Sequence, residues 1–345
     1  MYLRMCTFPR LGSRLKVMSR RSLSIRQKSA AVRARRIATA TASLLLAVRP
    51  AHGQSRWQVT SSPAADRWFA AMAQLDLPVP GTLTFYRRST QPPPAWRAQA
   101  ARARALEVLH FVPLYYPSAT PAALTAAVRA AANGQAAHTP RASFLVGALQ
   151  RTVTATDERQ LLAFVAALAD SAVHGDAVPD AQLAALQAAW DSVYAPALAP
   201  FLVARRLVGG ALLVSPALGA EGRIFEGRPG DPLDNVIAVG AARESGLIEA
   251  PLLEAVRESC APLITELSAD RRAWRDDPVS ASQASVRCGL ALVDRALPAR
   301  AEAYRTLWAR HAGAARFADA FPPNAREDTA IRAAIQSAFA SRDVR

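Results

Sequence analysis

The stretch from Leu207 to Leu267 constrains the fold of this chain more than any other part of its 345-residue sequence. It contains a β-like run at 207–216, LVGGALLVSP, and another at 235–239, NVIAV, with the short run RIFE (223–226) between them. Glycine and proline flank these runs, which is typical of short strands joined by turns. Because no helical crossover pattern separates the runs, we predict a small antiparallel sheet.

An amphipathic helix is predicted to follow the last strand. Its apolar residues recur at helical spacing and define one face, consisting of Leu252, Leu253, Val256, Cys260, Leu263, Ile264 and Leu267. We expect Pro262 to kink this helix, because proline has no backbone N–H and its ring clashes with the preceding turn.

Helical patterns surround this stretch on both sides. Alanine, a strong helix former, is abundant between Trp96 and Phe201, and Thr120-Pro121 is typical of a helix start. Asn324-Ala-Arg-Glu327 predicts a capping box, in which Asn324 and Glu327 exchange hydrogen bonds at the start of the last helix. The predicted fold class is therefore α+β and mostly helical, with alanine-rich helices and one small antiparallel sheet.

We divide the chain into three parts. Residues 1–53 are an export signal that is removed, residues 54–201 form a helical N-terminal lobe, and residues 202–345 hold the sheet and the C-terminal helices. The last two parts either form separate lobes or belong to one domain, and the sequence leaves both arrangements open.

The first 53 residues have the pattern of a leader peptide. Basic residues precede the apolar run Ile37–Val48, which is too short to span a bilayer as a mature helix, and small residues precede Gln54. Either Met1 or Met18 can be the start residue, and Arg35-Arg36 leaves the twin-arginine route open beside the general secretory route. We predict an exported protein, periplasmic or extracellular, without a transmembrane segment in its mature chain.

The net charge of the whole chain is misleading. The formal charge is +15, but residues 1–53 hold twelve of the 42 basic residues and none of the 27 acidic ones. The mature part is therefore almost balanced, whereas a nucleic-acid groove needs clustered positive charge on the folded domain. We expect no nucleic-acid partner, and the partner is otherwise an unknown protein, peptide or small molecule.

Removal of the leader would also remove Cys6 and leave one pair of cysteines. Cys260 and Cys288 lie on neighbouring predicted helices, and an oxidising compartment favours a disulfide between them. The alternative is two buried thiols that never meet.

The segment Arg257-Glu258-Ser259-Cys260-Ala261 is the nearest approach to a chemical motif. In the motif His-Glu-x-x-His, two histidines on one helix face bind zinc and the glutamate activates water. Only Glu258 matches here, because Arg257 and Ala261 occupy the ligand positions and neither can bind zinc. The order of strand, glycine turn, strand, helix and further helices resembles the zincin-type metallopeptidase scaffold with a degenerate motif.

This resemblance implies a shared scaffold without zinc hydrolysis, in which Glu258 would be the one remaining catalytic-type residue. The other interpretation is an ordinary amphipathic helix with Glu258 on its wet face. Glu107-x-x-His110 has the spacing of half a di-iron site but lacks a second copy, so a core histidine is the simpler interpretation. We predict no metal site and no cofactor.

Two functional hypotheses follow from these patterns. The first is a non-catalytic binding or scaffold protein that resembles a zincin. The alternative is a hydrolase whose unrecognised active site lies in a cleft between the helical lobe and the sheet.

Overall fold

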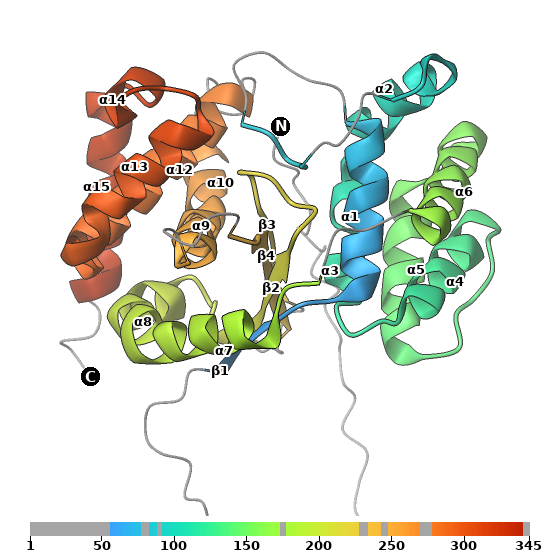
Figure 1. The fold of residues 1–345 in the computed structure, drawn as a ribbon, viewed down its shortest axis with the longest axis horizontal. Helices are drawn as coiled ribbons and strands as arrows, with labels where there is room; N and C mark the ends of the chain where they lie inside the picture. The colour runs from blue at the N-terminus through green and yellow to red at the C-terminus, as the bar shows by residue number, and fades with distance from the viewer. Residues whose placement is uncertain are drawn as a thin grey trace, which may run out of the picture. The chain divides into compact units, whose positions relative to one another are not determined.

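A computed structural model describes residues 56–76, 83–87, 92–172, 177–227, 234–242, 248–269 and 278–340. The predicted leader, residues 1–53, lies outside these ranges. Residues 53–345 belong to one compact unit. The predicted mostly helical α+β class is confirmed, with four strands in one sheet and helices on both of its sides (Figure 1).

The N-terminal helices pack mainly on one another. In chain order they are α1 (Pro63–Leu75), α2 (Arg97–Ala105), α3 (Val112–Tyr115), α4 (Pro121–Ala132), α5 (Pro140–Thr152) and α6 (Thr156–Ser171), with short 3₁₀ turns at Pro94–Trp96 and Glu107–His110. The helix start predicted at Thr120-Pro121 is confirmed, because the Thr120 hydroxyl accepts from the Ala123 amide at 3.2 Å. Such a bond satisfies an amide that has no partner within the helix.

A second set of helices surrounds the other side of the sheet. It consists of α7 (Asp180–Ala189), a π-helical turn (Trp190–Tyr194), α8 (Ala195–Ala204), α9 (Ala250–Ser259), α10 (Ala261–Ala269), α12 (Pro278–Ala296), a 3₁₀ turn (Pro298–Arg300), α13 (Ala301–His311), α14 (Phe317–Ala320) and α15 (Ala325–Ala340). The helix predicted around Pro262 is divided at Cys260 into α9 and α10, as expected of a proline that cannot continue the hydrogen-bond ladder.

The sheet is mixed, so the prediction of an antiparallel sheet was wrong for most of it. Its strands are β1 (Arg56–Thr60), β2 (Gly209–Ser215), β3 (Arg223–Phe225) and β4 (Asn235–Gly240), in the spatial order β1-β2-β4-β3. β2 is parallel to both β1 and β4, and only β3 and β4 are antiparallel. The connection between β2 and β4 carries β3 to the far edge, so β4 returns beside β2 in the same direction.

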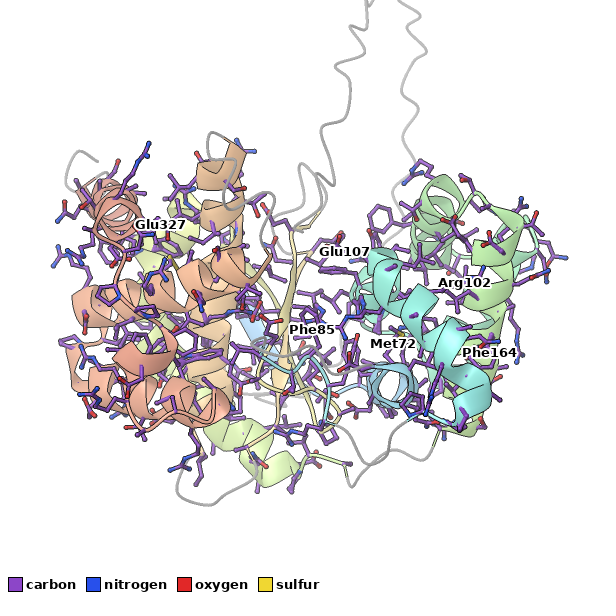
Figure 2. The ribbon with its side chains drawn as sticks, turned by 90° about the horizontal axis from the view of Figure 1, so that it is seen from above. Met72, Phe85, Arg102, Glu107, Phe164 and Glu327 are labelled. Carbon is purple, nitrogen blue, oxygen red and sulfur yellow. A yellow bond between two sulfur atoms is a disulfide. The ribbon has the colours of Figure 1, made fainter. Side chains whose placement is uncertain are left out.

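The two faces of the sheet pack against different helices, as the edge-on view of Figure 2 shows. Ile224 and Ile237 are directly opposed on β3 and β4 and belong to the apolar cluster around α9. Phe225 packs against the other group, where its ring centroid lies 4.8 Å from that of Tyr115 in α3. The sheet therefore separates two sets of buried side chains.

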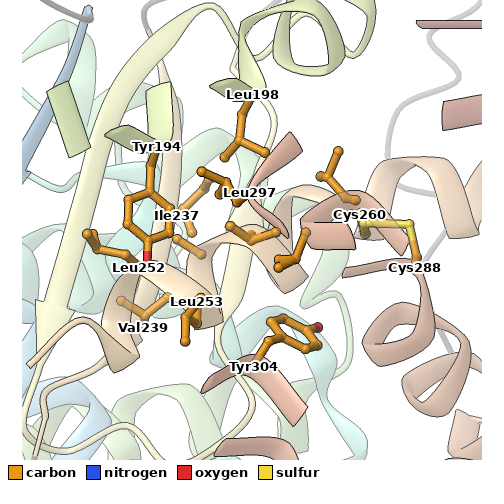
Figure 3. Close-up of a cluster of buried hydrophobic side chains, with 14 of the residues drawn as sticks. Tyr194, Leu198, Ile237, Val239, Leu252, Leu253, Cys260, Cys288, Leu297 and Tyr304 are labelled. Carbon is orange, nitrogen blue, oxygen red and sulfur yellow. A yellow bond between two sulfur atoms is a disulfide. The ribbon is translucent and has the colours of Figure 1, made fainter. Parts of the chain in front are cut away.

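The larger apolar core lies between the sheet and the second set of helices (Figure 3). Ile237 and Val239 from β4 meet Leu252 and Leu253 from α9, and Tyr194 and Leu198 add a layer from the segment before β2. All six are almost fully buried. Because α9 contributes to this core along its whole length, its polar side chains must also find partners inside the protein.

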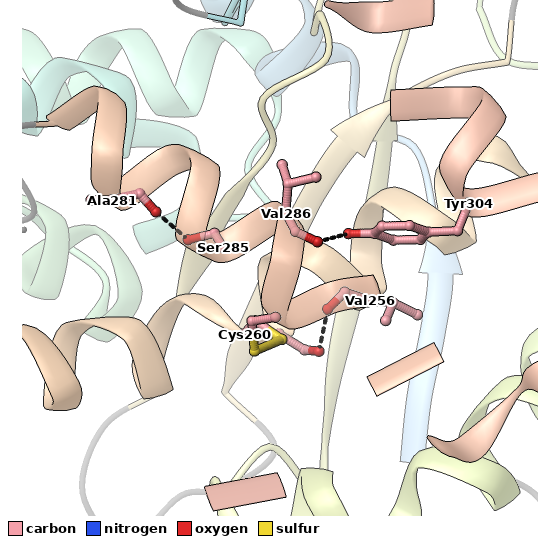
Figure 4. Close-up of a disulfide and its surroundings, with 8 residues drawn as sticks. Val256, Cys260, Ala281, Ser285, Val286 and Tyr304 are labelled. Carbon is pink, nitrogen blue, oxygen red and sulfur yellow. Dashed lines mark hydrogen bonds between the residues drawn. A yellow bond between two sulfur atoms is a disulfide. The ribbon is translucent and has the colours of Figure 1, made fainter. Parts of the chain in front are cut away.

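The predicted disulfide is confirmed (Figure 4). Cys260, between α9 and α10, is bonded to Cys288 of α12, with 6.1 Å between their Cα atoms. Nearby, the Tyr304 hydroxyl donates to the Val286 carbonyl at 3.0 Å and so joins α13 to α12. The disulfide therefore fixes the end of α9 against the middle of α12.

The capping box at Asn324 forms differently from the prediction. Asn324 Oδ1 accepts from the Glu327 amide at 3.3 Å, but the Asn324 amide donates to Asp328 Oδ2, at 3.1 Å, and not to Glu327. The Glu327 carboxylate instead pairs with Arg287 of α12. A tertiary ion pair has therefore replaced the local bond.

No helix among the residues described is both long and apolar enough to cross a bilayer.

Candidate functional site

The helix α9 has no wet face. Every residue from Ala250 to Ser259 is buried, including Glu254, Arg257 and Glu258. The interpretation that places Glu258 on an exposed helix face is therefore wrong. The reason is that α9 lies between the sheet on one side and α12 on the other, and its polar residues face partners supplied by both.

Arg257 is the centre of a buried ionic cluster. Its guanidinium contacts the carboxylate of Glu258, lies 3.1 Å from Glu221 Oε1 and donates to Ser282 Oγ at 3.2 Å. Ser282 in turn donates to the same Glu221 carboxylate. We call Glu221, Arg257, Glu258 and Ser282 the Arg257 cluster, and its members come from the loop before β3, from α9 and from α12.

Glu258 is held by a backbone group as well as by Arg257. Its Oε1 accepts from the Gly222 amide at 3.0 Å. A Cβ atom at position 222 would lie only 2.8 Å from Glu258 Cγ, so glycine is needed for this close approach. The Glu258 carboxylate is therefore fixed by a guanidinium and by the turn that leads into β3.

Burial gives the charges of the Arg257 cluster a large desolvation cost, which their mutual contacts must offset. Arg257 is 1 % exposed and Glu258 2 % exposed, and both sit in a region of low effective dielectric constant. A buried charge is tolerated only when it is paired and hydrogen-bonded. Loss of one partner from such a group typically costs about 3–5 kcal/mol, because the remaining charge is left uncompensated.

A second polar pair lies at the carboxyl end of β4. Glu254 accepts from the Gly240 amide at 2.9 Å, and its other oxygen lies 3.2 Å from Nε2 of His311. Burial raises the pKa of the Glu254 carboxyl, and His311 and Arg87 oppose that rise. His311 is partly exposed on α13, so a carboxylate-oriented imidazole reaches the surface here.

The Glu254–His311 pair has the layout of a general base and the carboxylate that orients it. A carboxylate that orients an imidazole is a common arrangement in acid–base catalysis. Within the described part of the chain, however, the only hydrogen-bond partner of the His311 ring is Glu254. The pair can therefore hold or move a proton, and among the described residues no hydroxyl or thiol is hydrogen-bonded to its imidazole.

Aromatic and cationic side chains fill the layer between the sheet and the N-terminal helices. The Arg223 guanidinium lies 3.8 Å from the Phe85 ring centroid, within the range of a cation–π contact. His110 stacks on Tyr86, and its Nδ1 lies 2.6 Å from the Tyr86 hydroxyl. Burial, with Arg223 nearby, lowers the pKa of His110 to about 3.

These contacts decide between the two interpretations of His110. His110 is 7 % exposed and its ring nitrogen is bonded to a tyrosine, so it is a core histidine. Across the described segments, no group of three or more His, Cys, Asp or Glu side chains is placed to hold a metal ion.

Of the residues singled out in the sequence, the structure brings together Arg257 and Glu258, and separately Cys260 and Cys288. Ala261 is buried at the start of α10 and contributes no polar atom. Four polar residues of these sites were not predicted from the sequence, because each contacts a residue that is distant along the chain: Glu221, Ser282, Glu254 and His311.

The chain matches no model of a known protein family, and comparisons with curated proteins and with solved structures also gave no match.

Proposed function

We propose that this chain is an exported, non-catalytic binding or scaffold protein that resembles a zincin-type metallopeptidase. The observation that carries the proposal is the buried pairing of Arg257 with Glu221 and Glu258. In the zinc motif, positions 257 and 261 would supply ligands and Glu258 would activate water. Here the Arg257 guanidinium supplies the positive charge. Glu258 forms an ion pair with Arg257 and accepts a hydrogen bond from the Gly222 amide.

The order of elements supports the resemblance in outline. β3 and β4 lead into α9, and further helices follow, as the sequence pattern suggested. The leader pattern and the pair Cys260–Cys288 support export, since disulfides persist in oxidising compartments. The nearly balanced charge of residues 54–345 favours a partner other than nucleic acid.

A zinc-uptake experiment tests the proposal. The full-length protein and its Glu258→Gln variant are dialysed against Zn²⁺ and then against metal-free buffer, and the zinc retained per chain is measured. We expect neither protein to retain stoichiometric zinc. One zinc per chain retained by the natural protein would overturn the proposal, and its persistence in Glu258→Gln would match a motif in which the glutamate activates water and is not a ligand.

The alternative function, a hydrolase, is favoured by one observation, the Glu254–His311 pair. Its test is hydrolysis of generic ester and peptide substrates by the natural protein and by His311→Gln. Turnover that disappears in His311→Gln but persists in Glu258→Gln would select the hydrolase. Equal background rates in all three proteins would reject it.

A further inference from the structure

The two outer strands of the sheet differ in length. β3, at one edge, has three residues, whereas β1, at the other edge, has five and pairs with β2 alone. An edge strand offers N–H and C=O groups to which another chain can bond, and a very short edge strand limits that risk. The longer β1 edge therefore needs protection of another kind. Neither β1 nor α7, the helix beside it, carries a member of the Arg257 cluster.

The residues of β1 do little to protect its edge. The strand contains neither proline nor glycine, and Trp57, Val59 and Thr60 are residue types that favour strands. Its one charged side chain, Arg56, is exposed at the first position. Proteins also protect such edges by covering them with another element.

The cover on β1 is the side chain of Gln187. This residue lies on α7, which runs beside β1 in Figure 1. Gln187 Oε1 accepts from the Val59 amide at 2.7 Å, and Nε2 donates to the Trp57 carbonyl at 3.1 Å. A glutamine side chain can do this because its amide has the acceptor and the donor of a backbone peptide group.

These two bonds have the pattern of a parallel strand. In a parallel ladder, one residue bonds through its N–H and its C=O to the two residues that flank its partner. Gln187 bonds in the same way to Trp57 and Val59, which flank Gln58. Its side chain therefore takes the place of one residue of a fifth strand, opposite Gln58.

The orientation of the Gln187 amide is fixed by a third bond. Nε2 also donates to Asp191 Oδ2 at 3.0 Å. An ionised carboxylate can only accept, so Nε2 faces Asp191 and Oε1 is left for Val59. Leu183 and Ala184, one turn earlier on α7, have no polar side-chain group that could replace the amide.

A second copy of the chain would compete for the same backbone groups. Two β1 strands that pair antiparallel about Gln58 place Trp57 opposite Val59 and Arg56 opposite Thr60, so no like charges are opposed. This arrangement has two-fold symmetry, and its hydrogen bonds use the Trp57 carbonyl and the Val59 amide. The side chain from α7 already holds both groups.

We propose that Gln187 keeps the chain from pairing with a second copy through β1. Its amide completes the hydrogen bonding of the edge and so ends the sheet there. Without this amide, the Trp57 carbonyl and the Val59 amide are open to β1 of another copy.

The test compares the full-length natural protein with Gln187→Leu, which keeps a side chain of similar size and removes both bonds. Hydrogen exchange is followed by mass spectrometry on the peptide that contains β1. We expect exchange in β1 to become about tenfold faster, as loss of a bond worth about 1.4 kcal/mol predicts. The matched control is Gln182→Leu, which adds the same side chain to α7 at a position with no bond to β1 and should change nothing.

Cross-linking then shows whether the opened edge pairs with a second copy. The two Gln58 positions face each other in the pairing of two β1 strands. Gln58→Cys/Gln187→Leu should therefore form a disulfide between two chains under mild oxidation, whereas Gln58→Cys alone should not. Gln58→Cys/Gln187→Glu keeps only the acceptor for the Val59 amide and should cross-link to a smaller extent. That variant carries the test if Gln187→Leu does not fold.

Three results would overturn the proposal. The first is unchanged exchange of β1 in Gln187→Leu. The second is absence of a cross-link in both double variants. The third is an equal cross-link in Gln58→Cys alone, which would mean that the edge is open in the natural protein.

Discussion

Arg257 is the most deeply buried charged side chain that the structure describes. This burial could not be predicted from the sequence pattern, because an Arg-Glu pair on an amphipathic helix ordinarily faces solvent. Its partners Glu221 and Ser282 lie 36 and 25 residues away along the chain. A local pattern cannot reveal contacts over such separations, so the motif could be located while its environment could not.

His110 illustrates the same limit and leads to a prediction about pH. Its folded-state pKa, about 3, lies below the ordinary value of 6.5. As the pH falls below 6.5, His110 therefore becomes protonated in the unfolded chain but stays neutral in the folded chain. The contribution of neutral His110 is present above that pH and is lost at up to about 1.4 kcal/mol per pH unit on the way down.

Replacement of His110 by glutamine removes this titration and keeps a group that can bond to the Tyr86 hydroxyl. We expect the unfolding free energy of the natural protein to fall more steeply between pH 6.5 and 4 than that of His110→Gln. Denaturant titrations at several pH values measure the difference, in which the titrations of other groups largely cancel. Parallel curves for the two proteins would contradict a buried neutral His110.

Helices could be predicted from the sequence where their start and stop signals are local. Thr120 and Pro121 start α4. Gly134, just after the end of this helix, has a positive φ of 69°, which glycine adopts readily. Strand pairing was harder to predict from the sequence than the ends of helices. β1 has alternating burial at Trp57 and Val59, but the residues of β2 with which it pairs lie 153 positions later in the chain, so its five residues predict little by themselves.

The disulfide joins two helices, and its removal is predicted to act at that level. In the chain-entropy model, closure of the loop between Cys260 and Cys288 stabilises the fold by about 3–4 kcal/mol. Cys260→Ala/Cys288→Ala should lose a stability of this size in urea unfolding. Both sulfur atoms are buried, so reduction of the natural protein after unfolding should lower its refolded stability by a similar amount.

Peptide mapping without reductant provides the control for this prediction. The peptides that contain Cys260 and Cys288 should be recovered as one linked species. Recovery of both thiols free and alkylated in the unreduced, denatured protein would contradict the bond.

At the scale of the whole molecule, the sheet joins the first described strand, β1, to the middle of the chain. β1 begins at Arg56, two residues after the predicted cleavage site, and Trp57 Nε1 donates to the Leu207 carbonyl at 3.1 Å. Cleavage before Gln54 would therefore leave β1 intact.

Export is a prediction about the chain as a whole. Mass spectrometry of secreted or periplasmic material should find an N-terminus near Gln54, because small residues precede it after the apolar run. Cytoplasmic protein that retains residues 1–53 would contradict export, and the disulfide would then need another oxidising environment.

The central claim is that Arg257 is held as a structural cation between Glu221 and Glu258, as the proposed function requires. The most direct measurement compares unfolding free energies of the natural protein, Arg257→Met and Glu221→Gln/Arg257→Met/Glu258→Gln. We predict that Arg257→Met loses about 3–5 kcal/mol and that the neutral triple variant recovers most of this loss. An Arg257→Met variant as stable as the natural protein, or a triple variant no more stable than the single one, would contradict the claim.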